Sequence, residues 1–259
     1  MKFCCIDTET TGLFVAYGDR ICEIALIDFD RRFRRTAVFS GLVDPRRKIS
    51  AGAYEVNRIE AEELRGAPKF SEVAEEVLDL VTGRILVGHN VHFDYDFLKN
   101  EMRLQNRKFE LEAMIDTVEV ARDLVVSNSY GLGILLRLFD IVPENRHRAL
   151  GDCRATFELF KKLYLIYTDK FSDNLVEFVR RYGRHPEDAV SVLPDWLKIA
   201  LAEKSEIEIV YTSRGKSSGR RKIKPISVYS AMGRTYLEAY CHLRNSRRTF
   251  LVQRIEKPR

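Results

Sequence analysis

The hydrophobic pattern of the first part of the chain predicts strands that give way to a helix. Short runs rich in aromatic and β-branched residues alternate with clusters of Gly, Asp and Arg as far as Val43. This pattern predicts three strands in a meander, over Lys2–Ile6, Arg20–Asp28 and Thr36–Val43. From Ala61 the apolar positions take up helical spacing, and a helix is therefore predicted that ends at Gly83.

The middle of the chain alternates between the two periods. A short apolar strand is predicted over Ile85–Val87, and the spacing of Phe93, Phe97 and Met102 predicts a helix after it. A long amphipathic helix is predicted from Ala149 to about Tyr167. Strands followed by alternating helix and strand indicate an α/β fold, with a mixed central sheet flanked by helices.

The last part of the chain reads as a separate, mostly β module. Helical character continues through Leu175 to Val179 and is then interrupted by Gly183, Pro186 and Pro194. After these, a short helix is predicted, followed by strands joined by polar turns. The predicted ranges are helix Trp196–Ala202 and strands Ile207–Tyr211, Ile223–Tyr229, Thr235–Cys241 and Thr249–Ile255. We therefore predict a domain over residues 1–168, a helical linker over 169–194 and a second domain over 195–259.

Composition and charge agree with two folded domains. The 259 residues are 45% hydrophobic and 31% charged, which suits globular cores and argues against a disordered chain. The net charge of +5 is uneven, because residues 195–259 carry 15 Lys and Arg against 6 Asp and Glu. Such a basic module is typical of polyanion binding, although basic side chains also solvate exposed strands.

Several classes of protein are excluded at this stage. The longest apolar runs, such as Ile24–Ile27, are far shorter than the roughly 18 residues that cross a membrane. Asp7 and Glu9 precede any apolar segment of a secretory signal, so a cytoplasmic protein is expected. The five cysteines form no C-x-x-C pair, so we expect reduced, buried thiols rather than a disulfide framework or a zinc site.

Two carboxylates end the first predicted strand. Because side chains alternate along a strand, Asp7 and Glu9 point to the same face. Two carboxylates held this close repel each other unless a cation lies between them, and their hard oxygens suit Mg²⁺ or Mn²⁺. An Asp-x-Glu sequence is also common in solvated turns, so this pair needs partners from elsewhere in the chain.

Two later stretches supply candidate partners. Asp94 follows a buried strand and falls in the first turn of a helix, where a carboxylate is favoured by the helix dipole. Asp152 lies in the opening turns of the long helix, and His147 stands five positions before it. An imidazole titrates near neutrality and can take a proton from water. The simpler alternatives are a capping role for Asp94 and an exposed loop position for His147.

Together, these three stretches resemble the three exonuclease motifs of the DEDD superfamily, in the subtype whose third motif supplies a histidine. The resemblance covers residues 1 to about 168, and within the superfamily the motifs resemble those of DnaQ-like proofreading subunits of bacterial replicative DNA polymerase. It implies a ribonuclease H-like exonuclease domain with His147 as general base. The residues that it implies as ligands of two divalent cations, Mg²⁺ or Mn²⁺, are Asp7, Glu9, Asp94 and Asp152. The tyrosine-bearing subtype would need Tyr at the position of Arg148.

The resemblance also implies a reaction and its substrate contacts. Two cations of this kind activate water on one side of a phosphodiester and neutralise the leaving 3′-oxygen on the other, which releases a nucleoside 5′-monophosphate. The implied substrate contacts are Thr10, Leu13 and Asn90. Relatives tend to carry a Val-His-Gly-Ile-like stretch where this chain has Val56-Asn57-Arg58-Ile59, so handling of the 3′ end is expected to differ.

The stretch from Trp196 to Arg259 resembles a WYL domain, an Sm-like β-barrel module named after a Trp-Tyr-Leu triplet that reads Thr235-Tyr236-Leu237 here. This resemblance implies a basic pocket for nucleic acid or a nucleotide-like ligand. Guanidinium groups match phosphate oxygens, and aromatic rings stack on bases. The candidate residues are Arg221, Lys222, Tyr229, Arg247 and Arg254. The alternative is that Tyr229 belongs to the barrel core and the basic residues protect edge strands.

We therefore expect a metal-dependent 3′–5′ exonuclease that acts on single-stranded or 3′-ended DNA in replication or repair, with a polymerase or repair complex as partner. Two alternatives stay open. One is an RNA 3′ exonuclease of the oligoribonuclease or RNase T type, because sugar preference depends on contacts to the 2′-OH. The other is a ligand-sensing regulator with a vestigial nuclease domain, which the presence of all four carboxylates and the histidine disfavours.

Overall fold

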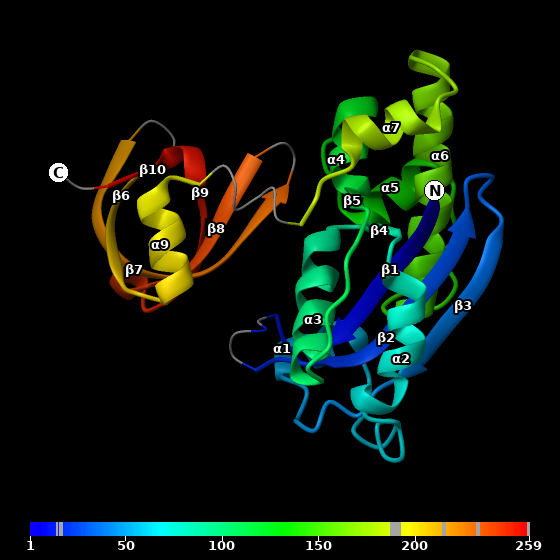
Figure 1. Cartoon of the computed structure of the whole chain (residues 1–259), viewed down its shortest axis with the longest axis horizontal. Coiled ribbons are helices and arrows are strands. Elements are labelled where there is room, and N and C mark those ends of the chain that lie inside the picture. Colours follow the sequence, from blue (N-terminus) through cyan, green and yellow to red (C-terminus); the bar gives the residue numbers. More distant parts are fainter. Residues whose placement is uncertain (14, 16–17, 187–192, 214–215, 232–233, 258–259) are drawn as a thin grey trace. The chain divides into compact units, whose positions relative to one another are not determined.

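The structure is a computed structural model that describes residues 1–13, 15, 18–186, 193–213, 216–231 and 234–257. It divides into two compact units, Met1–Arg184 and His185–Arg259 (Figure 1). The first unit has two clusters of buried apolar residues and the second unit has a separate one. None of the described helices is long and apolar enough to cross a membrane. The five cysteines are free and buried, as predicted.

A five-stranded mixed sheet forms the centre of the first unit. Its strands are β1 (Lys2–Thr10), β2 (Ile21–Asp30), β3 (Arg35–Leu42), β4 (Ile85–Gly88) and β5 (Ala113–Asp116). They lie in the order β3-β2-β1-β4-β5, with β1, β2 and β3 antiparallel and with β4 and β5 parallel to β1. The predicted meander and the mixed sheet are therefore confirmed, and β1 is the central strand.

Helices cover both faces of this sheet. They are α1 (Ala51–Asn57), α2 (Phe70–Val81), α3 (Val91–Leu104), α4 (Thr117–Leu124), α5 (Leu132–Leu138), α6 (Ala149–Lys170) and α7 (Leu175–Tyr182). Alternation along β1 sends Cys4 and Ile6 into the core with α2 and α3, and sends Phe3 and Cys5 into the core with α4, α5, α6 and α7. The strand β1 is therefore buried between two helical layers.

Three segments differ from what the hydrophobic pattern predicted. The helix predicted from Ala61 begins only at Phe70, because residues 61–66 form turns and Pro68 follows them. Helix α1 was not predicted, since seven residues are too few for a periodic signal; Ser50 caps it by accepting a hydrogen bond from the amide of Ala53. The segment from residue 113 to 124, for which no element was predicted, divides into β5 and α4. The division falls at Asp116, whose carboxylate accepts a hydrogen bond from the amide of Val118 and so caps α4.

Helix α7 lies within the segment predicted as a linker, and it packs on the first unit. The rings of Phe178 and Tyr182 contact Tyr167 of α6 at centroid distances of 5.0 and 6.0 Å. The division of the chain at residues 168 and 194 stays a prediction.

The described part of the second unit contains an α-helix and an antiparallel sheet. Its elements are α9 (Asp195–Glu203), β6 (Ile207–Ser213), β7 (Lys216–Ala231), β8 (Arg234–Cys241), β9 (Ser246–Leu251) and β10 (Ile255–Glu256). Leu197 of α9 packs with Ile209, Leu237 and Phe250 in the core. The predicted last strand is interrupted by a 3-10 turn, Val252–Arg254, which separates β9 from β10.

The expected Sm-like barrel is not confirmed. The strands lie in the order β10-β6-β7-β8-β9, and within the described residues no ladder joins β9 to β10. Strand β10 has two residues, which pair with Tyr211 and Val210 of β6. The described sheet is therefore open, with one edge formed by a very short strand.

Candidate active site

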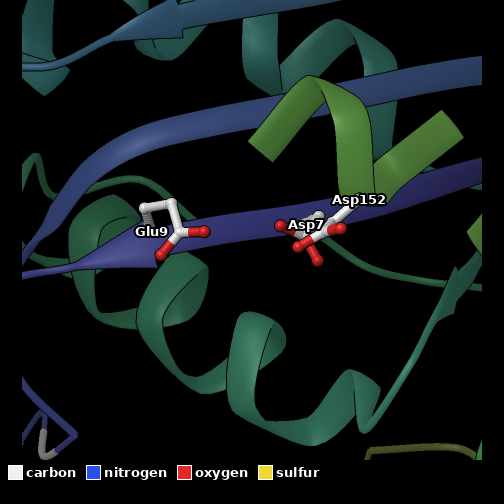
Figure 2. A group of neighbouring side chains, drawn as sticks. All are labelled: Asp7, Glu9 and Asp152. Carbon is white, nitrogen blue, oxygen red and sulfur yellow. The ribbon is translucent and has the colours of Figure 1, made fainter. Parts of the chain in front are cut away.

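Three carboxylates from two distant segments converge at the end of β1. Asp7, Glu9 and Asp152 each offer an oxygen, and these three oxygens all lie within 4.8 Å of one another. Figure 2 shows Asp7 and Glu9 along β1 and Asp152 meeting Asp7 from the first turn of α6. Carboxylate oxygens are the ligands that Mg²⁺ and Mn²⁺ prefer, so this donor set fits a divalent cation.

The packing of α6 on β1 fixes this arrangement. Asp7 continues the face of β1 that buries Phe3 and Cys5, so an apolar face becomes acidic where the core ends. Beside the site, the thiol of Cys153 donates to the carbonyl oxygen of Cys5 at 3.4 Å. Cys153 is the neighbour of Asp152 in the chain. The same contact that packs the helix on the strand therefore brings Asp152 next to Asp7.

The site carries more negative charge than its surroundings neutralise. Burial raises the pKa of Asp7 well above its ordinary value, and the charges of Asp94, Asp152 and Glu9 add to this effect. Burial, followed by the charges of Asp152 and Glu23, raises the pKa of Glu9 to about 8. Oδ1 of Asp152 is buried, and none of the described groups donates a hydrogen bond to it. A cation would satisfy this oxygen and relieve the repulsion.

Asp94 lies beside this group, but its Oδ1 is already bound. It is buried in the first turn of α3 and accepts a hydrogen bond of 2.7 Å from the hydroxyl of Thr8. Thr8 lies between Asp7 and Glu9 on β1 and points to the opposite face, which faces α3. Burial raises the pKa of Asp94 to about 7. The charge of Asp94 therefore raises the pKa of Asp7, but Asp94 does not belong to the group of three carboxylates whose oxygens lie within 4.8 Å of one another.

His147 is exposed in the loop before α6, at the edge of the three carboxylates. Its backbone is left-handed, with φ of 61°, and its amide donates to Oδ2 of Asp152 at 3.1 Å. Burial raises the pKa of Asp152, and the hydrogen bond from the His147 amide, followed by the charge of His147, partly opposes this effect. The loop is thus tied to the first turn of α6, with the imidazole open to solvent beside Asp152.

The three predicted substrate contacts have different environments. Thr10 is buried, and its hydroxyl donates to the carbonyl of Gly12 at 2.6 Å. Leu13 is 66% exposed, as a residue that meets substrate has to be. Asn90 is exposed in a left-handed conformation, and its backbone amide donates to Oδ1 of Asp116 at 3.0 Å. Only Leu13 and Asn90 therefore have side chains open to solvent.

The departure at positions 57 and 58 has a structural explanation. Asn57 is 2% exposed and donates from Nδ2 to the carbonyl of Thr10 at 3.3 Å, so it ties α1 to the end of β1. Arg58 ends α1 in a left-handed conformation, and its guanidinium lies 5.6 Å from the ring centre of Tyr54. Asn57 therefore supports the strand that carries the acidic pair.

Sequence reasoning missed an ion pair beside Glu9. Glu23 of β2 lies opposite Glu9 in the ladder and is 5% exposed. The guanidinium of Arg148 binds it through Nε at 3.0 Å and Nη2 at 3.1 Å, and also reaches Glu63 at 3.3 Å. Arg148 was considered only as the residue that stands where the other subtype has Tyr. Its partner lies 125 residues away, so no local signal could reveal the pair.

The candidate residues of the C-terminal unit do not share one face of its sheet. Arg221 pairs in register with the buried Ile209, whereas Lys222 and Arg247 alternate to the other face. Lys222 binds Glu206 at 2.6 Å, and Arg247 binds Glu238 at 3.2 Å. Arg254 is exposed, and the side chain of Tyr229 lies outside the described residues.

Comparison with known families agrees with this geometry. Residues 4–160 match the family model described as Exonuclease. The chain belongs to the exonuclease family. Residues 195–259 match a second model, the WYL domain. The described second unit is therefore a WYL domain with an open sheet, attached to an α/β ribonuclease H-like exonuclease unit.

Relatives of known function match the first unit. The DNA polymerase III subunit epsilon of Treponema pallidum is 35% identical over 163 residues, which cover 62% of this chain and 75% of that protein. The same subunit of Rickettsia felis is 32% identical over 164 residues, covering 61% and 72%. With the family match, these relatives make the chain a DnaQ-like 3′–5′ exonuclease. Its family depends on divalent metal ions.

Solved structures show the same fold. Exonuclease X in complex with 5′ overhanging duplex DNA is 26% identical, with a TM-score of 0.52 over 66% of this chain and 94% of that one. Exonuclease I in its apo form has a TM-score of 0.58 at 16% identity, over 99% of this chain and 64% of that one. The second likeness concerns the fold alone.

Proposed function

We propose that this exonuclease removes nucleoside 5′-monophosphates one at a time from the 3′ end of DNA, with two divalent cations and His147 as general base. The observation that carries the proposal is the convergence of Asp7, Glu9 and Asp152, whose oxygens lie within 4.8 Å of one another. Nothing else in the described unit would offset so much buried negative charge as directly as bound cations.

Four carboxylates would hold the cations. Asp7, Glu9 and Asp152 form the converging group, and Asp94 stands beside Asp7 with its Oδ1 fixed by Thr8. When bound, Mg²⁺ or Mn²⁺ would polarise the phosphodiester and the attacking water and would neutralise charge on the leaving oxygen. The hydroxyl of Thr8 holds the carboxylate of Asp94 in one orientation.

His147 would take the proton from the attacking water at an imidazole nitrogen. Its ring is exposed, while its amide is held by Asp152, so the ring can meet water and the loop keeps its place. General base catalysis of this kind contributes roughly 10²–10⁴-fold to a rate. Leu13, which is exposed near the end of β1, would pack on the terminal nucleotide, with Asn90 and the backbone of Thr10 beside it.

DNA is the proposed substrate because the relatives at 32% and 35% identity are subunits of DNA polymerase III. A polymerase or repair complex is the proposed partner on the same ground. The WYL domain is proposed to bind nucleic acid or a nucleotide-like ligand, with Arg221, Lys222, Tyr229, Arg247 and Arg254 as candidates. Its excess of basic side chains supports this assignment, because phosphate contacts dominate binding to polyanions.

The proposal is tested with an oligonucleotide labelled at its 5′ end and supplied as matched DNA and RNA. The wild-type protein should shorten the DNA from its 3′ end in Mg²⁺ or Mn²⁺, and chelator should stop the reaction. Asp7→Ala should lose activity by at least about 10³-fold while keeping its circular dichroism spectrum. Full activity of Asp7→Ala would refute the site, and faster digestion of RNA would refute the substrate.

A further inference from the structure

A dense group of arginines occupies the turn between β2 and β3, and the proposed reaction does not use it. The six residues from Asp30 to Arg35 contain four arginines and one carboxylate. All four arginines are exposed. Residues 1–194 as a whole carry 28 basic and 32 acidic side chains, so the excess of basic residues in this turn is local. We refer to residues 30–35 as the arginine turn. It is a strongly basic spot on a mildly acidic unit.

Asp30 closes this turn. Its Oδ1 accepts hydrogen bonds from the amides of Arg32 and Arg34, at 2.8 and 3.0 Å. Its Oδ2 accepts from Nε and Nη2 of the Arg34 side chain, at 2.9 and 2.6 Å. Asp30 and Arg34 therefore act within the turn, as a clamp on its backbone. The other three arginines are left to face outward.

Phe33 anchors the turn to the protein. It adopts a left-handed conformation with φ of 58°, which is unusual for a bulky residue. Its ring lies 6.1 Å from that of Phe29, 5.9 Å from Phe160 and 5.2 Å from Tyr164. Packing on α6 compensates for the backbone conformation and holds the tip of the turn in place. The arginines on either side are thus presented from a fixed support.

Arg31, Arg32 and Arg35 are available to a ligand. Within the described part of the chain, no carboxylate forms an ion pair with any of them. An arginine matches two phosphate oxygens with parallel donors, so three neighbouring guanidinium groups suit a phosphodiester backbone. The turn lies at the start of β1, where Lys2 pairs with Asp30. Asp7 is five strand residues further on, or about 17 Å at roughly 3.3 Å per residue.

We propose that the arginine turn binds backbone phosphates of the nucleic acid whose 3′ end lies at the carboxylates. This inference rests on the proposed function, because it concerns the same substrate. About 17 Å corresponds to about five stacked nucleotides at roughly 3.4 Å each, and this is a minimum, because helices cover both faces of β1 and the nucleic acid has to pass around them. A long strand or duplex therefore spans the distance from the carboxylates to the turn, and a dinucleotide does not. The turn should affect binding and processing of long substrates only.

The test compares two triple variants in the full chain. Arg31→Gln/Arg32→Gln/Arg35→Gln removes the outward charges and keeps Phe33 and the Asp30 clamp. The matched control, Lys99→Gln/Arg103→Gln/Lys108→Gln, removes the same charge from exposed positions on and after α3. Binding of a strand of about 30 nucleotides is measured over a range of salt concentrations in chelator. Hydrolysis is measured on the long strand and on a dinucleotide in Mn²⁺.

We expect the first variant to bind the long strand roughly tenfold more weakly at low salt, with a log–log salt slope shallower by about 2. Its hydrolysis of the dinucleotide should equal that of the wild type, and the control variant should change less than about twofold. Unchanged binding and slope, or an equal loss on both substrates, would overturn the inference. If the first variant binds an acidic peptide more weakly than the wild type does but binds DNA equally well, the inference is also overturned. Absence of hydrolysis by the wild type would instead refute the proposed function, with the binding comparison unaffected.

Discussion

Arg148 connects three segments around the acidic end of β1. It binds Glu23 of β2 and Glu63, and it directly precedes α6, whose first amide, that of Ala149, donates to Glu23 at 3.0 Å. Because Glu23 lies opposite Glu9, its charge adds to the repulsion within the site, and the charge of Arg148 opposes this effect. Arg148 is therefore a positioning residue: it neutralises Glu23 and fixes the start of the helix that carries Asp152.

Arg148→Gln should lower kcat about tenfold and weaken Mn²⁺ binding measured by calorimetry, because Glu23, left as an unpaired buried charge, turns toward solvent and no longer holds the start of α6, which carries Asp152. Adding Glu23→Gln should restore most of both losses. The control is Arg154→Gln, which breaks an exposed ion pair with Glu144 and should change neither quantity more than about twofold. If the double variant binds Mn²⁺ no better than the single one, the charge argument is wrong.

Repulsion within the carboxylate group should limit the stability of the metal-free protein. Glu9→Gln removes a carboxylate whose pKa is raised to about 8 by burial and by the neighbouring charges. The free energy of unfolding in chelator should therefore be higher for the variant than for the wild type, by about 1 kcal/mol or more. Added Mg²⁺ should raise the Tm of the wild type and have a smaller effect on the variant. Thermal unfolding followed by circular dichroism provides the measurement. Glu76→Gln, an exposed change on α2, serves as the control, and equal responses of both variants would contradict the expectation.

At this scale, the sequence revealed residues whose role follows from a local rule. Alternation along one strand was enough to pair Asp7 with Glu9, and a place in the first turn of a helix was enough to single out Asp94. It did not reveal that Thr8 binds Asp94, or that Arg148 binds Glu23, since these contacts join residues 86 and 125 positions apart. Such contacts depend on how the helices pack on the sheet, which no local pattern determines.

Among the elements, the first turn of α6 is the most closely constrained. A Cβ at Gly151 would overlap the backbone carbonyl oxygens of Glu144 and Asn145, which cross directly over the helix. The loop that holds His147 follows immediately. The absence of a side chain at Gly151 therefore allows this loop to approach α6, and the loop approach in turn places His147 beside Asp152.

Gly151→Ala should displace the 144–147 loop, lower the Tm by several degrees and reduce kcat by more than about tenfold, with a smaller change in KM. Gly52→Ala is the matched control, since Gly52 also lies in the first turn of a helix but has open space around it. That change should stabilise α1 by roughly 0.5–1 kcal/mol and leave activity unchanged. Equal effects of the two substitutions would show that loop contact with α6 is unimportant.

The predictability of elements followed their length and periodicity. Helices α2 and α6 and the first three strands were predicted because each presents a repeated apolar face. Helix α1 was missed because its seven residues bury only Asn57, so no apolar face exists to be detected. The last strand was predicted too long, since Val252 keeps the apolar pattern across a 3-10 turn that only tertiary contacts distinguish from a strand.

At the scale of the whole molecule, the two units have separate cores and opposite charge balance. Removing residues 195–259 should leave the exonuclease unit folded, because among the described residues its two cores include none beyond Tyr182. The truncated protein should hydrolyse a dinucleotide at the wild-type rate, bind long DNA more weakly and show a shallower salt dependence. Fluorescence anisotropy at several salt concentrations measures this. Unchanged affinity would assign the WYL domain a role other than binding the substrate.

The central position of β1 has a kinetic consequence. The strand pairs with β2 along one edge and with β4 along the other and lies between two helical layers, so its amides can be exposed to water only when both layers separate from the sheet. Amide hydrogens of Cys4, Cys5 and Ile6 should therefore exchange with deuterium only through global unfolding, as the slowest in the chain. The acidic pair at the end of this strand is thus held in place for as long as the molecule stays folded.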